Sequence, residues 1–186
     1  MTRIIAGEWG GRRLTVPDGT GTRPTSDRVR EALFSALESR VVLAGARFAD
    51  LYAGSGAIGL EALSRGAGHA LLVESDPRAA RTVRANLATL GAARRAELRI
   101  DRAERVLTAP PAQPYHVVVA DPPYSLPDDR VDEMLTALVT GGWLAEEAVV
   151  VVERPRRGTP IGWVSGIIDD GVRRYGESVL WYGRRS

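Results

Sequence analysis

The chain has 186 residues, of which 44% are hydrophobic and 26% charged, and this composition is typical of one soluble globular domain. No stretch approaches the roughly 18 consecutive apolar residues of a membrane span, and the first residues lack the apolar core of a signal peptide, so we expect a cytoplasmic protein with no membrane partner. The absence of cysteine excludes disulfides, iron–sulfur clusters and thiolate nucleophiles, and with only two histidines we expect no metal site. The net charge of +2 is too small to indicate a nucleic-acid partner by itself.

Positive charge is concentrated at the start of the chain, where two short strands are expected around a turn at Gly10–Gly11. Residues 1–30 carry six arginines against three acidic residues, an excess of +3 that exceeds the +2 of the whole chain. A glycine-rich connection over 18–25 follows, and a helix from about 28 to 40 begins after a cap at Ser26 or Asp27. We therefore expect an arm and linker over 1–27 and a larger domain over 28–186.

The stretch from Phe48 to Gly59 is an apolar run that ends in a glycine-rich loop and opens a helix. Gly54 and Gly56 let backbone N–H groups approach a ligand, and Gly59 lets the helix lie close to the strand. Glu74 lies about 20 residues further on, where a carboxylate can accept hydrogen bonds from ribose hydroxyls. The arrangement favours a nucleotide-binding loop, although G-x-G-x-x-G alone also fits an ordinary tight turn.

The remaining elements alternate between strands and helices, as in a mostly parallel sheet buried on both faces by helices. Strands are expected over 69–74, 96–101, 115–120 and 148–152, and helices over 77–91, 103–107 and 128–139. The last two strands, 167–175 and 178–182, are joined directly at Gly176–Glu177 and must therefore pair antiparallel. We predict a Rossmann-like α/β sheet with strand order 3-2-1-4-5 plus this antiparallel pair.

The segment Asp121-Pro122-Pro123-Tyr124 ends the fourth strand, which neighbours the first strand and its glycine loop in this order. Because the winding of the sheet reverses between these two strands, both segments are expected to face one cleft. Two prolines remove two N–H donors and leave the Asp121 carboxylate and the Pro122 carbonyl as acceptors, which complements an amino group. The Tyr124 ring can stack on a heterocycle, so the cleft suits the exocyclic amine of a nucleobase. A Pro-Pro turn with an exposed acid is the plainer interpretation.

These residues carry a family resemblance. The motifs Asp50-Leu51-Tyr52-Ala53-Gly54-Ser55-Gly56 and Asp121-Pro122-Pro123-Tyr124 resemble those of class I S-adenosylmethionine-dependent amino-methyltransferases. The stretches Arg3–Gly7, Thr22–Glu31 and Leu60–Ala67 are similar to the RsmD family, and the similarity covers essentially the whole chain. It implies methylation of the N2 amine of one guanine in small-subunit (16S) ribosomal RNA, position 966 in RNA numbering, with S-adenosyl-L-methionine as cofactor. The implied partner is ribosomal RNA in an assembled or assembling small subunit.

Residue roles are implied by the same resemblance. Catalytic roles fall on Asp121, Pro122 and Tyr124, which would hold and stack the guanine. The cofactor-binding positions, running from the methionine end through the ribose at Glu74 to the adenine, are Asp50, Tyr52, Gly54, Ser55, Gly56, Glu74, Asp101, Arg102 and Ala103. The RNA-binding positions, expected to contact phosphate, are Arg3, Arg12, Arg13, Arg23, Thr25, Arg28 and Arg30. The arm departs from the family pattern at Glu8 and Gly10, where amide or basic residues are expected.

Other functions share part of this pattern. An NAD-dependent oxidoreductase has the glycine loop and the downstream acid, but leaves the D-P-P-Y segment and the antiparallel tail unexplained. A DNA or RNA adenine-N6 methyltransferase uses the same acceptor edge and ring. A non-catalytic RNA-binding protein, or an arm that is merely a solvated arginine-rich hairpin, also remains open. Covalent cytosine-C5 methylation requires a thiolate, which the chain lacks.

Overall fold

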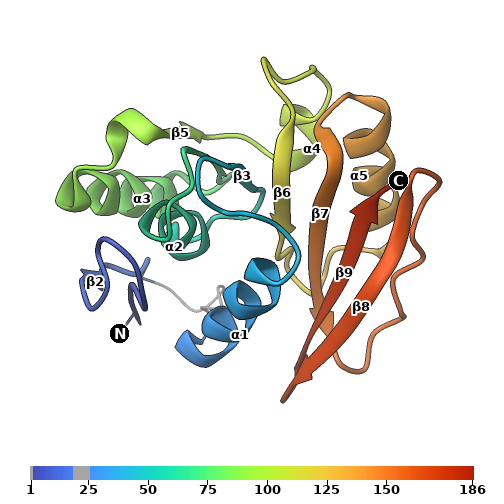
Figure 1. Ribbon diagram of the computed structural model, residues 1–186, viewed down its shortest axis with the longest axis horizontal. Helices are drawn as coiled ribbons and strands as arrows, with labels where there is room; N and C mark the ends of the chain where they lie inside the picture. The colour runs from blue at the N-terminus through green and yellow to red at the C-terminus, as the bar shows by residue number, and fades with distance from the viewer. Residues whose placement is uncertain (1, 19–25) are drawn as a thin grey trace.

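The computed structural model describes residues 2–18 and 26–186, which form a seven-stranded sheet with helices on both faces and a small two-stranded sheet at the N-terminus (Figure 1). The strands of the large sheet are β3 (Arg47–Asp50), β4 (His69–Val73), β5 (Ala96–Arg99), β6 (Tyr115–Ala120), β7 (Leu144–Pro155), β8 (Ile167–Tyr175) and β9 (Ser178–Arg185). Their order is β5-β4-β3-β6-β7-β9-β8, so the predicted order 3-2-1-4-5 is confirmed for the first five strands. These five are parallel, and β9 pairs antiparallel with β7 and β8, as predicted.

The helices are α1 (Asp27–Glu38), α2 (Ala57–Ser64), α3 (Pro77–Leu90), α4 (Ala103–Val106) and α5 (Asp128–Thr140), with a short 3-10 helix η1 (Ala93–Arg95). The first three cover one face of the sheet, and α4 and α5 cover the other (Figure 1). Alternate residues of β6 pack against the helices on opposite faces of the sheet. Val117 and Val119 pack toward α1–α3, whereas Val118 and Ala120 pack toward α4 and α5. Burial on both faces explains the unbroken apolar runs of β6 and β7. None of the helices in the described ranges is long and apolar enough to cross a bilayer.

Local sequence signals fix the helix ends and the helix–strand distances near the carboxyl edge of the sheet. Ser26 caps α1, since its Oγ accepts a hydrogen bond from the Val29 N–H at 3.2 Å. Asp76 caps α3 in the same way, and Pro77 occupies its first turn. A Cβ on Gly59 of α2 would stand 2.2 Å from Leu72 Cδ2 on β4. Glycine is therefore required for α2 to lie this close to the strand.

The N-terminal arm is packed onto the larger domain. Its two strands, β1 (Thr2–Arg3) and β2 (Arg13–Leu14), pair antiparallel as predicted but are only two residues long each. Beyond β1 the backbone bonds to α2 instead: the two Glu61 carboxylate oxygens accept hydrogen bonds from the Ile5 and Ala6 N–H groups at 2.8 and 3.1 Å. Three apolar arm residues enter the core cluster beneath α1–α3, namely Ile4, Trp9 and Leu14. The short strands thus reflect a backbone whose hydrogen bonds are divided between the arm and the domain.

Candidate active site

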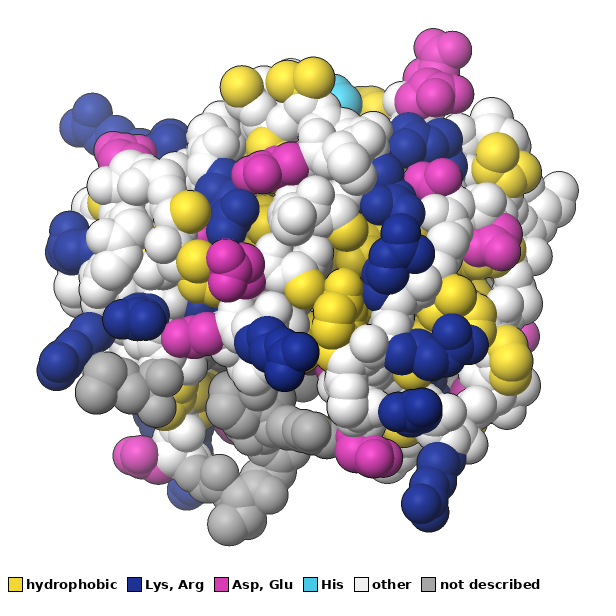
Figure 2. Space-filling model, turned by 60° about the horizontal axis from the view of Figure 1, so that its bottom comes forward, with side chains coloured by type: hydrophobic (Ala, Val, Ile, Leu, Met, Phe, Trp, Pro, Cys, Tyr) yellow, Lys and Arg dark blue, Asp and Glu magenta, His cyan; other side chains and the backbone are white. Residues whose placement is uncertain are grey.

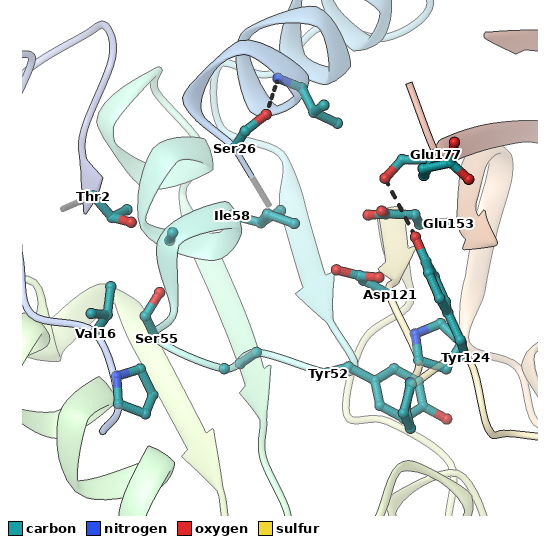
Figure 3. Close-up of a pocket in the computed structure, with 18 of the residues that line it drawn as sticks. Thr2, Val16, Ser26, Tyr52, Ser55, Ile58, Asp121, Tyr124, Glu153 and Glu177 are labelled. Carbon is teal, nitrogen blue, oxygen red and sulfur yellow. Dashed lines mark hydrogen bonds between the residues drawn. The ribbon is translucent and has the colours of Figure 1, made fainter. Parts of the chain in front are cut away.

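The carboxyl ends of β3, β6 and β7 open into a cavity of about 1160 Å³, shown in Figure 3. The glycine loop after β3 forms one wall, and the segment Asp121–Tyr124 after β6 forms the opposite wall. The arm contributes Val16 and Pro17, and the turn between β8 and β9 contributes Glu177. The two motifs that are distant in the sequence therefore meet in one cavity, as the strand order predicts.

Gly54 and Ser55 face this cavity, whereas Gly56 shapes the turn behind them. Gly54 has φ 57°, and no atom of residues 2–18 or 26–186 lies within 4 Å of the position that its Cβ would take. Ser55 lines the cavity, and its carbonyl accepts a hydrogen bond from Asn86 Nδ2 at 2.9 Å. Gly56 has φ 85°, is the N-cap residue of α2, and is absent from the described lining of either cavity. The positive φ values require glycine at both loop positions.

Glu74, at the end of β4, lines both the large cavity and a second one of about 200 Å³. The walls of the second cavity include four predicted cofactor positions, Tyr52, Asp101, Arg102 and Ala103. The Glu74 carboxylate accepts the Gly54 N–H and the Asp76 N–H, each at 2.8 Å, which fixes its orientation and leaves lone pairs for ligand hydroxyls. Burial raises the pKa of Tyr52 to about 12, so its phenol stays protonated and can donate. Two adjacent cavities that share Glu74 in their walls fit an elongated nucleoside attached to an amino acid.

Asp50 does not reach this site. It is fully buried at the end of β3 and belongs to the lining of neither cavity, so the structure does not support its predicted contact with the methionine end. Burial raises its pKa to about 7, although the N–H groups of Gly59 and Tyr52 act in the opposite direction. Asp50 therefore lies behind the loop, between the end of β3 and Gly59 of α2. The sequence motif alone does not show whether the Asp50 side chain faces the cavity or is buried behind the loop.

The opposite wall carries the predicted catalytic residues. Asp121 and Pro122 line the cavity, and the Asp121 carboxylate points into it (Figure 3). The Tyr124 side chain is 41% exposed, and its hydroxyl lies 3.4 Å from Ser178 Oγ. Arg154 of β7, which the sequence analysis missed, is buried beside this segment and donates a hydrogen bond to the Leu126 carbonyl at 2.8 Å. The loop that follows Asp121 is thus anchored from the next strand.

Glu153, also on β7, is a second residue that the sequence analysis missed. Ala120 of β6 is aligned with Val152 of β7, so Asp121 and Glu153 follow at equivalent positions on adjacent parallel strands. Glu153 is 7% exposed and lines the cavity, with its carboxylate directed into it beside Asp121 (Figure 3). The available signal was an acid placed directly after a run of four valines.

Arginines surround the cavity opening. Arg28 is exposed and lines the cavity, as does Arg174 of β8, which the sequence analysis did not identify. Figure 2, which brings this edge of the sheet forward, shows basic side chains on both sides of exposed apolar ones. The arm arginines Arg3, Arg12 and Arg13 are exposed. The predicted RNA contacts Arg23 and Thr25 lie outside the described residues.

Arg30 is a correction to the predicted RNA-binding set. Its side chain is fully buried, with Nε 3.3 Å from a Glu61 carboxylate oxygen and Nη2 3.1 Å from Asp27 Oδ1. Nη2 also donates to the Arg3 carbonyl. A buried guanidinium is retained only when it is paired, so Arg30 ties the arm to α1 and α2 and does not contact RNA. The unusual arm residue Glu8 pairs with Arg95 at 2.9 Å.

Within residues 2–18 and 26–186, no group of three or more His, Asp or Glu side chains is arranged to hold a metal ion. The carboxylates of the cavity can accept hydrogen bonds from a ligand. One wall combines a glycine loop with Glu74, and the other presents Asp121 and Glu153. This division suits a nucleoside cofactor on one side and an amino group on the other.

Comparison with known proteins identifies relatives over nearly the whole chain. The family model described as Conserved hypothetical protein 95 matches residues 2–184. The chain is 43% identical over 152 residues to the Ribosomal RNA small subunit methyltransferase D of Escherichia coli (strain K12), covering 81% of this chain and 73% of that protein. It is 36% identical over 166 residues to the Haemophilus influenzae protein of the same name, covering 87% and 84% of the two chains.

Solved structures agree with these relatives. An Escherichia coli structure described as a candidate methyltransferase, yhhF, superposes with a TM-score of 0.85 at 37% identity and covers 100% of this chain and 98% of that one. An RNA methyltransferase from Salinibacter ruber, solved in complex with S-adenosyl-L-homocysteine, has a TM-score of 0.66 at 16% identity, with 88% and 94% of the chains covered, and shows the shared fold alone. The chain therefore belongs to the family described as Conserved hypothetical protein 95, which is the RsmD family of methyltransferases that its motifs resemble.

Proposed function

We propose that the protein uses S-adenosyl-L-methionine to methylate the N2 amine of one guanine in 16S ribosomal RNA. The observation that carries the proposal is that the glycine loop and the acceptor-only Asp121-Pro122-Pro123 segment form opposite walls of one cavity. The relatives named Ribosomal RNA small subunit methyltransferase D support the RNA and the subunit as the target. By the same resemblance, the nucleotide is position 966 in RNA numbering.

The cofactor side is assigned from the loop outward. S-adenosyl-L-methionine supplies an electrophilic methyl group when it is bound. Gly54 and Ser55 leave room for its methionine end, and Glu74, held by two backbone N–H groups, accepts hydrogen bonds from the ribose hydroxyls. The smaller cavity beside Asp101 receives the adenine, with the protonated Tyr52 phenol between the two cavities.

The target amine is held by the other wall. The exocyclic amine of guanine is conjugated with its ring and weakly nucleophilic, so catalysis depends mostly on orientation. Asp121 and the Pro122 carbonyl accept hydrogen bonds from the two N–H groups of the amine, and Tyr124 stacks on the ring. Asp121 need not be a strong base in this scheme, because the proton can leave after the amine has become cationic.

The arginines of the rim account for RNA binding. The target base must leave its stack to enter a cavity, which costs less in a single-stranded or loop region of RNA than in a duplex. Arg28 and Arg174 at the opening, together with the exposed arm arginines, contact phosphates and set the register without reading sequence. The substrate is then an assembled or assembling small subunit in the cytoplasm.

The test is transfer of a labelled methyl group from S-adenosyl-L-methionine to small subunits that lack the modification, followed by mapping of the labelled nucleotide. We expect one labelled nucleotide, identified as N2-methylguanine by mass spectrometry. Naked 16S ribosomal RNA and duplex DNA serve as parallel substrates and distinguish particle, RNA and DNA specificity. Absence of label in every RNA substrate, from protein that binds S-adenosyl-L-homocysteine, would contradict the proposal.

A further inference from the structure

Glu153 lines the cavity but has no role in the proposed reaction. It follows the last valine of β7, is 7% exposed, and points into the cavity beside Asp121 (Figure 3). Adjacent strands of a sheet lie about 4.8 Å apart, so the aligned positions of Asp121 and Glu153 place two carboxylates side by side at the carboxyl edge. Neighbouring acidic groups repel each other, so a ligand that donates a hydrogen bond to Glu153 would lower this repulsion.

Among residues 2–18 and 26–186, no hydrogen bond or ion pair to the Glu153 carboxylate is found, and no metal-binding cluster includes it. Its neighbour Arg154, by contrast, is tied to the Leu126 carbonyl and to Asp128. A buried acidic side chain without a protein partner, directed into a cavity, is suited to accept a hydrogen bond from a ligand.

We propose that Glu153 reads the N1–H of the target guanine and makes the site specific for that base. On its Watson–Crick edge, guanine presents two adjacent donors, the N2 amine and the N1–H. Asp121 with the Pro122 carbonyl accepts from the amine, and Glu153, one strand away, accepts from N1–H. This inference rests on the proposed guanine-N2 activity and adds the feature that selects the base.

The same geometry excludes a purine that carries an amine but has no N1–H. Adenine has an acceptor at N1 beside its N6 amine, and 2-aminopurine has an acceptor at N1 beside its N2 amine. In either case the Glu153 carboxylate would face a lone pair, so a buried acceptor would lose its donor and repel the base. Glu153 is therefore a specificity-determining residue, whereas Asp121 acts on any exocyclic amine.

The experiment compares small subunits that carry guanine or 2-aminopurine at the target position, since both bases have the reactive N2 amine. Wild-type protein should favour guanine, by about 10- to 100-fold in kcat/KM, the range of a hydrogen bond to a charged group. In Glu153→Gln the amide N–H can donate to N1 of 2-aminopurine, so the preference should fall at least about tenfold. Glu153→Ala should lose guanine activity without gaining 2-aminopurine activity.

A binding measurement supports the kinetic one. In the presence of S-adenosyl-L-homocysteine, the Kd ratio for the two kinds of subunit should shift in Glu153→Gln in the same direction as kcat/KM. Glu146→Gln, an exposed acid on the same strand, is the matched control and should leave both ratios unchanged. If the wild type methylates guanine but neither Glu153 variant changes the ratios, the inference is overturned and the proposed function stands. If the wild type methylates no guanine, the proposed function itself fails.

Discussion

The two walls of the cavity differ in the chemical groups that they present: one presents mostly backbone and the other mostly side chains. The cofactor wall, residues 52–55 with Glu74, is mostly loop backbone, and its one charged side chain is held by backbone N–H groups. The base wall, formed by Asp121, Pro122, Tyr124 and Glu153, acts through side chains and through a backbone from which proline removes donors. The first wall depends on chain geometry, and the second depends on particular functional groups.

This difference predicts separable defects. A substitution in the base wall removes an acceptor or a ring and leaves the fold of the loop intact, so it should affect turnover and base choice. A substitution in or behind the cofactor wall changes the loop itself, so it should affect cofactor affinity and stability. A variant that fails in both properties would show that the two walls are coupled.

Asp121→Ala should give the largest effect on turnover. Without the carboxylate the amine loses its main acceptor and its orientation, and the rate should fall on the order of 10²- to 10³-fold or more. The measurement is single-turnover methyl transfer to small subunits, with S-adenosyl-L-homocysteine affinity measured by calorimetry on the same protein. The affinity should remain close to that of the wild type. Asp129→Ala, an exposed acid of α5, is the matched control, and unchanged turnover in Asp121→Ala would remove this residue from the mechanism.

The fold could be predicted because its signals are local. The glycine loop, the cap at Ser26, Pro77 in the first turn of α3 and the β-branched runs each define an element without reference to distant residues. The strand order followed from the alternation of strands and helices, which is typical of an open α/β sheet whose winding reverses at the ligand site. The predicted arm strands are present but only two residues long each, since Glu61 accepts hydrogen bonds from backbone N–H groups that a longer hairpin would have used.

The residues of the site that were missed or misplaced depend on long-range pairing. Glu153 and Arg154 extend a valine run, and only the register of β7 against β6 places Glu153 beside Asp121 and Arg154 beside the loop that follows it. Arg30 lies in an amphipathic helix, where arginine is normally exposed, but Glu61 and the arm backbone enclose it. Asp50 belongs to a binding motif, yet its side chain turns away from the cavity into the space between β3 and α2.

Asp50→Asn tests the buried carboxyl group behind the cofactor wall through the pH dependence of stability. The pKa of Asp50 is raised from 3.8 to about 7 by burial, so between about pH 4 and 7 the folded protein holds a proton that the unfolded chain releases. This contribution to stability is fully present below pH 4 and is lost as the pH rises through 7. The free energy of unfolding of the wild type, relative to Asp50→Asn, should therefore fall by about 2–4 kcal/mol from pH 4 to 8. Urea denaturation curves at several pH values measure it, and parallel pH profiles for the two proteins would refute the assignment.

Glu74→Ala should weaken the cofactor wall without affecting the base wall. The variant loses the acceptor for ribose and frees the Gly54 N–H, so the affinity for S-adenosyl-L-homocysteine should fall about 10- to 100-fold. Calorimetry gives this value, and Glu97→Ala, an exposed acid on β5, is the control. RNA affinity and the preference for guanine at saturating cofactor should not change. A loss of base preference would show that the walls are not independent.

Arg28→Ala should have the smallest effect and concerns the rim that both walls share. Arg28 lines the cavity and is exposed, and an arginine that contacts one phosphate contributes about 0.7–0.9 to the slope of log affinity against log salt. The variant should bind small subunits a few-fold less tightly at moderate salt, with a slope lower by that amount, and bind S-adenosyl-L-homocysteine normally. Arg94→Ala removes the same charge from η1, which precedes β5 and so lies at the opposite edge of the sheet. If both variants lowered the slope equally, the RNA would be held by the general charge of the protein, and the rim of the cavity would lose its assigned role in placing the base between the two walls.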